Sequence, residues 1–171
     1  MIDFQKYIQR YLDLIPFSDW LKEMGNSFDD TVAVYRSFTE EQGNYAYAEG
    51  KWTLKEVLQH IIDAERIYAY RALRFARQDK TVLPGWDEVS YGLTYDVKNR
   101  STESLLQEFE AVRRSSVLFF THLDVSQLSA SGTANGNELS VELLGKLIVG
   151  HNIHHLNVIK ERYISNLNLH P

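Results

Sequence analysis

Residues 53–76 read TLKEVLQHIIDAERIYAYRALRFA, and most of the apolar residues recur at spacings of three or four. This is the period of one face of an α-helix. Thr53 followed by Glu56 matches the capping-box pattern that marks a helix start. The stretch therefore predicts a long amphipathic helix whose apolar face must pack against other elements of the chain.

Three other segments show the same helical period, and they follow Ser18, Ser101 or Thr102, and Ser140. Four amphipathic segments of about 20 residues each predict an all-α fold, a four-helix bundle. The segment from Phe4 to Leu14 predicts a short extra helix before Pro16.

The connections between these predicted helices are uneven. About 20 residues, 79–100, connect the second predicted helix to the third, which indicates a long crossover. Loops of this length in compact domains are often functional. A turn-rich run, residues 131–137, precedes the fourth predicted helix.

Length and composition narrow the function classes. The 171 residues form one domain of ordinary size, which we expect to span 1–171. Eighteen basic and 23 acidic residues give a net charge of −5, which argues against nucleic-acid binding. The absence of cysteine excludes disulfides, thiolate metal ligands and cysteine nucleophiles. No signal peptide or membrane-spanning run is recognisable, so we expect a cytoplasmic protein that does not enter membranes.

Two histidines occupy core positions of the fourth predicted helix. His151 and His155 are four residues apart, so both side chains project from one helix face, in phase with its apolar stripe. Burying two imidazoles costs roughly 1–3 kcal/mol for each unsatisfied polar group. A divalent metal ion would satisfy both rings. The alternative is a pair of core histidines that are hydrogen-bonded to protein groups.

The other four histidines have different expected roles. His60 lies at the edge of the apolar arc of residues 53–76, where it is either a third metal ligand or a partly solvated side chain. His154 either supports a ligand, lines a pocket or is simply exposed. His122, near the end of the third predicted helix, is expected to be structural. His170 is near the chain end and is expected to be disordered.

Several charged residues of the second predicted helix need partners or solvent. Glu65 falls in its apolar stripe, so it should form an ion pair, for example with Arg162, orient a metal-bound histidine, or act as a base. Most of its arginines should be solvated, although one or two could meet an anionic cosubstrate; they are Arg66, Arg71, Arg74 and Arg77.

Two stretches with histidines carry a resemblance to a known family. Residues 50–66, with His60, and residues 150–155, with His151 and His155, resemble the DinB-like (YfiT-like) superfamily of bacterial metal-binding four-helix bundles. Residues 83–88 and 132–137 are similar to one branch of it.

The resemblance implies a metal held by three histidines, one from the second helix and two from the fourth. These positions are His60, His151 and His155, and the metal would be zinc or nickel. Three neutral imidazoles leave coordination positions open for water or substrate, as in catalytic sites. Family members are often dimers, so a homodimer is expected.

The resemblance also implies small-molecule chemistry. Some members are described as metal-dependent hydrolases, others transfer a low-molecular-weight thiol, bacillithiol or mycothiol, to electrophiles, and one branch isomerises maleylpyruvate with mycothiol. We therefore expect a metal-dependent S-transferase or hydrolase. Trp86 would be a pocket wall or a plug that anchors the crossover, and Asp87 or Glu88 a base. The alternative is a non-catalytic metal-binding bundle that serves in a stress response or binds a partner.

Overall fold

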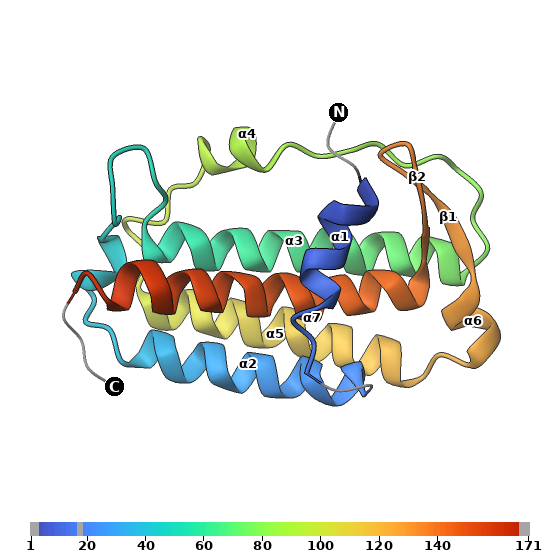
Figure 1. The fold of residues 1–171 in the computed structure, drawn as a ribbon, viewed down its shortest axis with the longest axis horizontal. Helices are drawn as coiled ribbons and strands as arrows, with labels where there is room; N and C mark the ends of the chain where they lie inside the picture. Colours follow the sequence, from blue (N-terminus) through green and yellow to red (C-terminus); the bar gives the residue numbers. More distant parts are fainter. Residues whose placement is uncertain (1–3, 17–18, 168–171) are drawn as a thin grey trace.

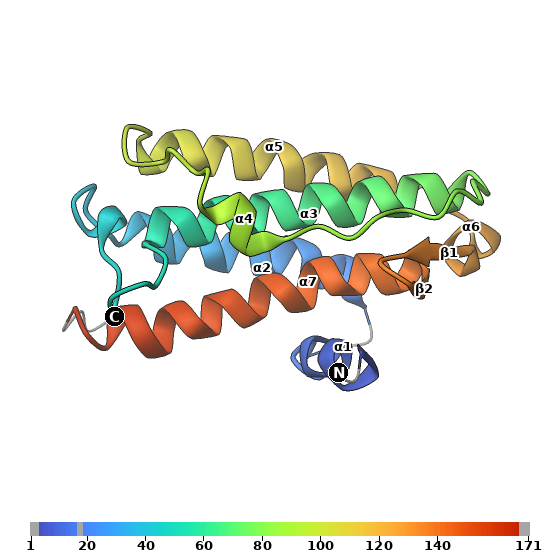
Figure 2. The same cartoon turned by 90° about the horizontal axis from the view of Figure 1, so that it is seen from above.

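The computed structural model describes residues 4–16 and 19–167, which form the predicted four-helix bundle. Figure 1 shows the four long helices lying side by side, and Figure 2 shows the short α1 outside them, against α7. The bundle helices are α2 (Trp20–Arg36), α3 (Leu54–Ala76), α5 (Thr102–Thr121) and α7 (Val141–Val158). The extra helix α1 (Phe4–Leu12) lies within the range predicted for it.

Each bundle helix begins at a polar cap. Thr53 and Glu56 form the predicted capping box of α3. Ser101 and Ser140 accept backbone N–H bonds at the starts of α5 and α7. Asp19 caps α2, and the predicted start at Ser18 lies outside the described residues. These caps satisfy N–H groups that have no partner within the helix.

The connections contain short elements that the helical period did not predict. They are the 3₁₀ turn η1 (Gln42–Asn44), α4 (Glu88–Gly92), α6 (Val125–Ser129), the strands β1 (Ser131–Ala134) and β2 (Asn137–Ser140), and the π-helical segment η2 (Ile159–Ile164), which continues α7.

The two strands form an antiparallel hairpin just before α7. Their register pairs Ser131 with Ser140 and Ala134 with Asn137. Asn135 and Gly136 turn the chain with φ of 50° and 74°, a left-handed conformation that glycine and asparagine tolerate best. The crossover joins this hairpin through a parallel bridge between Leu83 and Ala134.

Among the described residues the core has two large apolar clusters along the bundle and a small third one, Ile8, Tyr11 and Leu147, where α1 packs on α7. Of the two large clusters, one surrounds Trp20, Phe75 and Phe120 near the hairpin, and the other surrounds Phe109 and Tyr163. Within residues 4–16 and 19–167, no helix combines the length and apolar character that crossing a bilayer requires.

Gly150 allows α1 to lie directly against α7. A Cβ atom at this position would lie 2.3 Å from the backbone oxygen of Tyr11. We expect Gly150→Ala to lower the free energy of unfolding by about 1–3 kcal/mol, because backbone must move to relieve the overlap. Urea denaturation followed by circular dichroism measures this change.

Gly25 provides the matched control for this substitution. It lies inside α2, and a Cβ there would meet nothing within 4 Å. Gly25→Ala should therefore raise stability by about 0.5–1 kcal/mol, the ordinary gain in helix propensity. Equal gains from both substitutions would mean that the contact between Gly150 and α1 does not constrain the fold.

Candidate metal centre

Three histidine rings from two helices meet inside the bundle. His60 comes from α3, and His151 and His155 lie one turn apart on α7. The Nε2 atom of His151 lies 3.1 Å from the Nε2 atoms of both His60 and His155. One ligand nitrogen from each ring lies within 4.8 Å of the others. His60 and His151 are buried, and His155 is partly exposed.

This arrangement fits a divalent metal ion. Nitrogens that bind a tetrahedral ion at 2.0–2.1 Å lie about 3.3 Å from one another, close to the observed separations. The Nδ1 atom of His60 is buried and has no hydrogen-bond partner among the described residues. This is not the nitrogen that meets the other two histidines, so the fit to an ion rests on the Nε2 atoms that converge.

Aromatic rings cover the buried side of the triad. Trp52 and Trp86 lie against His60, with ring centroids 4.7 and 5.8 Å away, and the Trp86 ring is stacked at 21°. Tyr11 and Tyr68 meet the His151 ring edge-on, at 5.6 and 6.1 Å. The site is therefore shielded from solvent except near His155.

Burial keeps the three imidazoles neutral. It lowers the pKa of His60 to about 4, with a smaller contribution from His154. Burial also lowers the pKa values of His151 and His155 well below the ordinary histidine value, and the neighbouring histidines reinforce this effect. Because only a neutral imidazole binds a metal ion, the protein prepares these rings as ligands at neutral pH.

The remaining histidines take separate positions. His154 is partly buried, with its ring against His155 at 5.1 Å and Tyr11 at 5.3 Å. His122 ends α5, where its Nδ1 atom lies 2.8 Å from the Leu118 carbonyl oxygen, consistent with a structural role. His170 lies outside the described residues.

Glu65 forms an ion pair, but not with Arg162. Its carboxylate accepts hydrogen bonds from Nε and Nη2 of Arg113, at 2.8–3.0 Å, and both side chains are almost fully buried. Arg113 also donates to Asn152 and to the Met24 backbone. The helical period predicts that Glu65 is buried but does not indicate which helix faces it. The expected partner, Arg162, was therefore wrong, and the partner is Arg113.

The four arginines in and just after α3 have different surroundings. Arg66 pairs with Glu108 and Arg74 with Asp79, and Arg77, the residue after α3, is exposed. Arg71 differs because only 6% of it is exposed.

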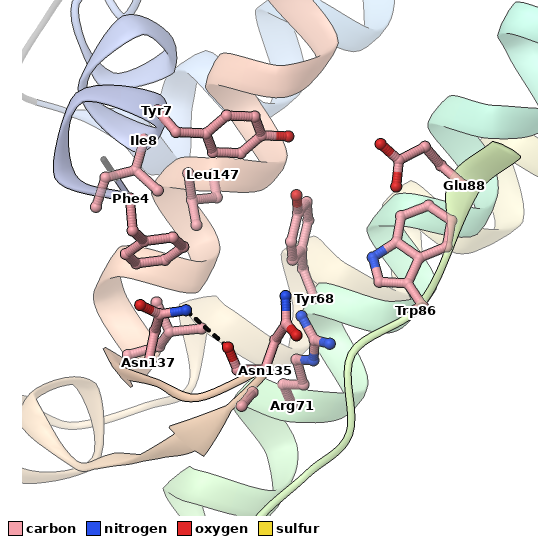
Figure 3. Close-up of a pocket in the computed structure, with 12 residues that line it drawn as sticks. Phe4, Tyr7, Ile8, Tyr68, Arg71, Trp86, Glu88, Asn135, Asn137 and Leu147 are labelled. Atoms are coloured by element: carbon pink, nitrogen blue, oxygen red, sulfur yellow. Dashed lines mark hydrogen bonds between the residues drawn. The ribbon is translucent and has the colours of Figure 1, made fainter. Parts of the chain in front are cut away.

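A pocket of about 660 Å³ lies next to the triad. Figure 3 shows it between α1 and α7 on one side and α3 and the crossover on the other. Trp86 and Glu88 both line it. Asp87 instead caps α4 through hydrogen bonds from Val89 and Ser90, and these lower its pKa.

Sequence reasoning missed two tyrosines, Tyr11 and Tyr68, that contact the triad. Tyr68 lies in the apolar stripe of α3, eight residues after His60 and therefore near the same face, which was the available signal. Tyr11 belongs to α1, and no sequence period indicates where an extra helix packs on a bundle.

Comparisons with known proteins agree with this fold and site. The model of the DinB superfamily matches residues 25–159. A protein of Oceanobacillus iheyensis named "Putative metal-dependent hydrolase" is 26% identical over 144 residues, which cover 83% of this chain and 82% of the relative. A protein of Geobacillus thermodenitrificans with the same name is 25% identical over 140 residues, which cover 80% and 78% of the two chains.

A solved structure gives the same result for the fold. YfiT from Bacillus subtilis, described as "a probable metal-dependent hydrolase with an unusual four-helix bundle topology", superimposes with a TM-score of 0.77. The match covers 91% of this chain and 93% of YfiT, at 17% identity. Because the family model spans most of the chain, including all three histidines, this protein belongs to the DinB superfamily.

Proposed function

We propose that the protein is a metal-dependent hydrolase that acts on a small molecule. The convergence of three neutral imidazole nitrogens, from His60, His151 and His155, carries this proposal. Zinc and nickel are the ions that suit this donor set best. The names of the two curated relatives support the same reaction class.

A bound divalent ion supplies Lewis acidity, which makes a nucleophile available at neutral pH. The chain's own residues shape the site around it. Trp52 and Trp86 exclude water from the His60 side. Tyr68 lines the adjoining pocket, and burial raises the pKa of its hydroxyl above the ordinary value. The hydroxyl therefore stays protonated and can donate a hydrogen bond to a substrate oxygen.

Transfer of a small thiol is the second candidate, and the absence of cysteine is compatible with it. With no cysteine in the chain, a reacting sulfur would have to come from a cosubstrate. The pocket of about 660 Å³ falls within the usual range for small-molecule sites.

A reconstitution assay tests the proposed function. Untagged protein, loaded with zinc or nickel, is assayed for hydrolysis of nitrophenyl esters and for transfer of small thiols to chlorodinitrobenzene. We expect ester turnover that requires metal and falls at least about 100-fold in His155→Ala. His122→Ala, which changes a histidine outside the centre, should retain wild-type turnover within about twofold.

The same assay separates the alternatives. If only the thiol reaction shows turnover, the proposed function becomes S-transfer and hydrolysis is rejected. Stoichiometric metal without consumption of either substrate class would contradict both reactions and favour a binding module.

A further inference from the structure

The pocket beside the triad has an apolar side and a polar end. Elements distant in sequence build it: α1, α3, α7, the crossover and the hairpin. In Figure 3, one side presents apolar side chains and the other end presents polar ones. The apolar group is Phe4, Ile8 and Leu147, and the polar group is Arg71, Asn135 and Tyr68.

Arg71 is a buried cation without an acidic partner. Its guanidinium donates one hydrogen bond, from Nη2 to the carbonyl oxygen of Pro84 at 2.9 Å. No carboxylate among residues 4–16 and 19–167 lies within 4.0 Å of it, although the residue is only 6% exposed. A guanidinium has five N–H donors, and burying its charge unpaired is costly. The remaining donors are therefore available for an anion in the pocket.

The structure holds Arg71 and Asn135 in place. The crossover pairs with the hairpin through hydrogen bonds from Leu83 N to Thr133 O at 2.9 Å, and from Asn135 N to Leu83 O at 3.1 Å. Gly85 permits this approach, since a Cβ there would lie 2.5 Å from the Asn135 side-chain oxygen. Arg71 donates to Pro84, and the Asn135 amide lies against the next residue, Gly85, so both sets of donors sit at the same end of the pocket (Figure 3).

Glu88, the acidic residue that lines the pocket, lies apart from Arg71. Glu88 is exposed and, in Figure 3, its carboxylate lies beyond the Trp86 ring. It repels an anion at its own end of the pocket and leaves the Arg71 end favourable. The positions of Arg71 and Glu88 therefore determine the orientation of an anionic ligand in the pocket.

The pocket shares two walls with the metal centre. Trp86 stacks on His60 and Tyr68 meets His151, while none of the three histidines lines the pocket itself. Arg71 follows His60 by eleven residues on α3, a rise of about 16 Å between their backbones, but both side chains meet one short stretch of the crossover, Arg71 at Pro84 and His60 at Trp86. A small molecule can therefore reach both the guanidinium and the metal centre.

We infer that Arg71, assisted by Asn135, binds the carboxylate at one end of a small-molecule substrate whose other end reaches the metal centre. This inference rests on the proposed function, because it names the substrate class of the same site. Arg71 is thus a specificity-determining residue and Trp86 and Tyr68 flank the route between the two ends.

Paired probes with and without a carboxylate test this inference. Mercaptohexanoate and mercaptohexanol have the same chain length and the same thiol, which can bind the metal. Their dissociation constants are measured by calorimetry on the zinc-loaded protein. Wild type should bind the acid about 10-fold more tightly or better, the usual effect of a charged hydrogen bond. In Arg71→Gln the two probes should bind equally, with mercaptohexanol unaffected.

Two further variants control for charge and folding. Arg77→Gln removes the same charge from an exposed position at the end of the same helix and should keep the preference for the acid. Arg71→Lys keeps the charge but loses the planar fork, so it should retain only part of the preference. Thermal melts of all variants show whether each is folded.

Hexanoate titrated into metal-free protein separates this inference from the proposed function. Binding that weakens about 10-fold in Arg71→Gln supports the anion site even if no reaction is ever found. An absence of acid preference in wild type, or a preference that Arg71→Gln retains, overturns the inference whatever the turnover assays give.

Discussion

Replacing His151 by alanine is expected to abolish metal binding. Its Nε2 atom lies 3.1 Å from both other ligand nitrogens, so its loss leaves only the imidazoles of His60 and His155 to hold the ion. One ligand of a structural zinc site contributes about 3 kcal/mol of the binding free energy. Losing that ligand therefore lowers metal affinity roughly 100-fold or more. Elemental mass spectrometry on untagged protein should show about one zinc or nickel per chain in wild type and almost none in the variant.

Thermal melting gives the same prediction a second readout. An ion present at about 1,000 times its dissociation constant stabilises a protein by about 4 kcal/mol, so zinc should raise the melting temperature of wild type but not of His151→Ala. His154→Ala is the matched control, because it changes the neighbouring histidine of α7 outside the triad. Metal retained in His151→Ala, or none in wild type after incubation with either ion, would rule out the three-histidine site.

The second large effect is expected at Arg113, which lies on α5 and is hydrogen-bonded to the other three helices of the bundle. It pairs with Glu65 of α3, reaches Asn152 of α7, and donates to the backbone of Met24 in α2. Arg113→Met leaves the Glu65 carboxylate buried without a counter-ion. We expect a loss of about 3–5 kcal/mol, a large part of the 5–15 kcal/mol that stabilises a typical domain. Guanidinium denaturation measures it.

A control and a double variant isolate the cause. Arg114 is adjacent but exposed, so Arg114→Met should change stability by less than about 0.5 kcal/mol. Glu65→Leu combined with Arg113→Met removes both charges and should recover at least half of the loss, since apolar replacements of buried ion pairs are often tolerated. If Arg113→Met alone stays within about 1 kcal/mol of wild type, the buried pair is not what holds these helices together.

The sequence predicted the bundle because its information is local. Helical periods and the caps at Thr53, Ser101 and Ser140 place the helices nearly where the structure has them. The hairpin was missed because its strands are four residues long, too short for alternation to be visible. Asn135-Gly136, a pair favoured in hairpin turns, was the signal that could have revealed it.

The sequence likewise predicts only the local part of the candidate site. The spacing of His151 and His155 on one helix predicts that they share a face, and the structure brings His60 to them across 91 residues. Neither the partner of Glu65 nor the isolation of Arg71 could be predicted, because both depend on which helices face one another. Helix contacts of this kind are set by packing of the whole bundle rather than by any local pattern.

The position of α1 has a consequence for how this protein could acquire new ligands. Residues 25–159, which match the superfamily, include the three histidines, Arg71 and Trp86, whereas α1 precedes them and adds Phe4, Tyr7 and Ile8 to the pocket. Reactive groups and part of the selective surface thus occupy separate stretches of the chain. Substitutions in α1 therefore change the pocket wall without changing any of the three histidines. Natural or engineered variation in α1 can alter which ligands fit and leave the metal centre as it is.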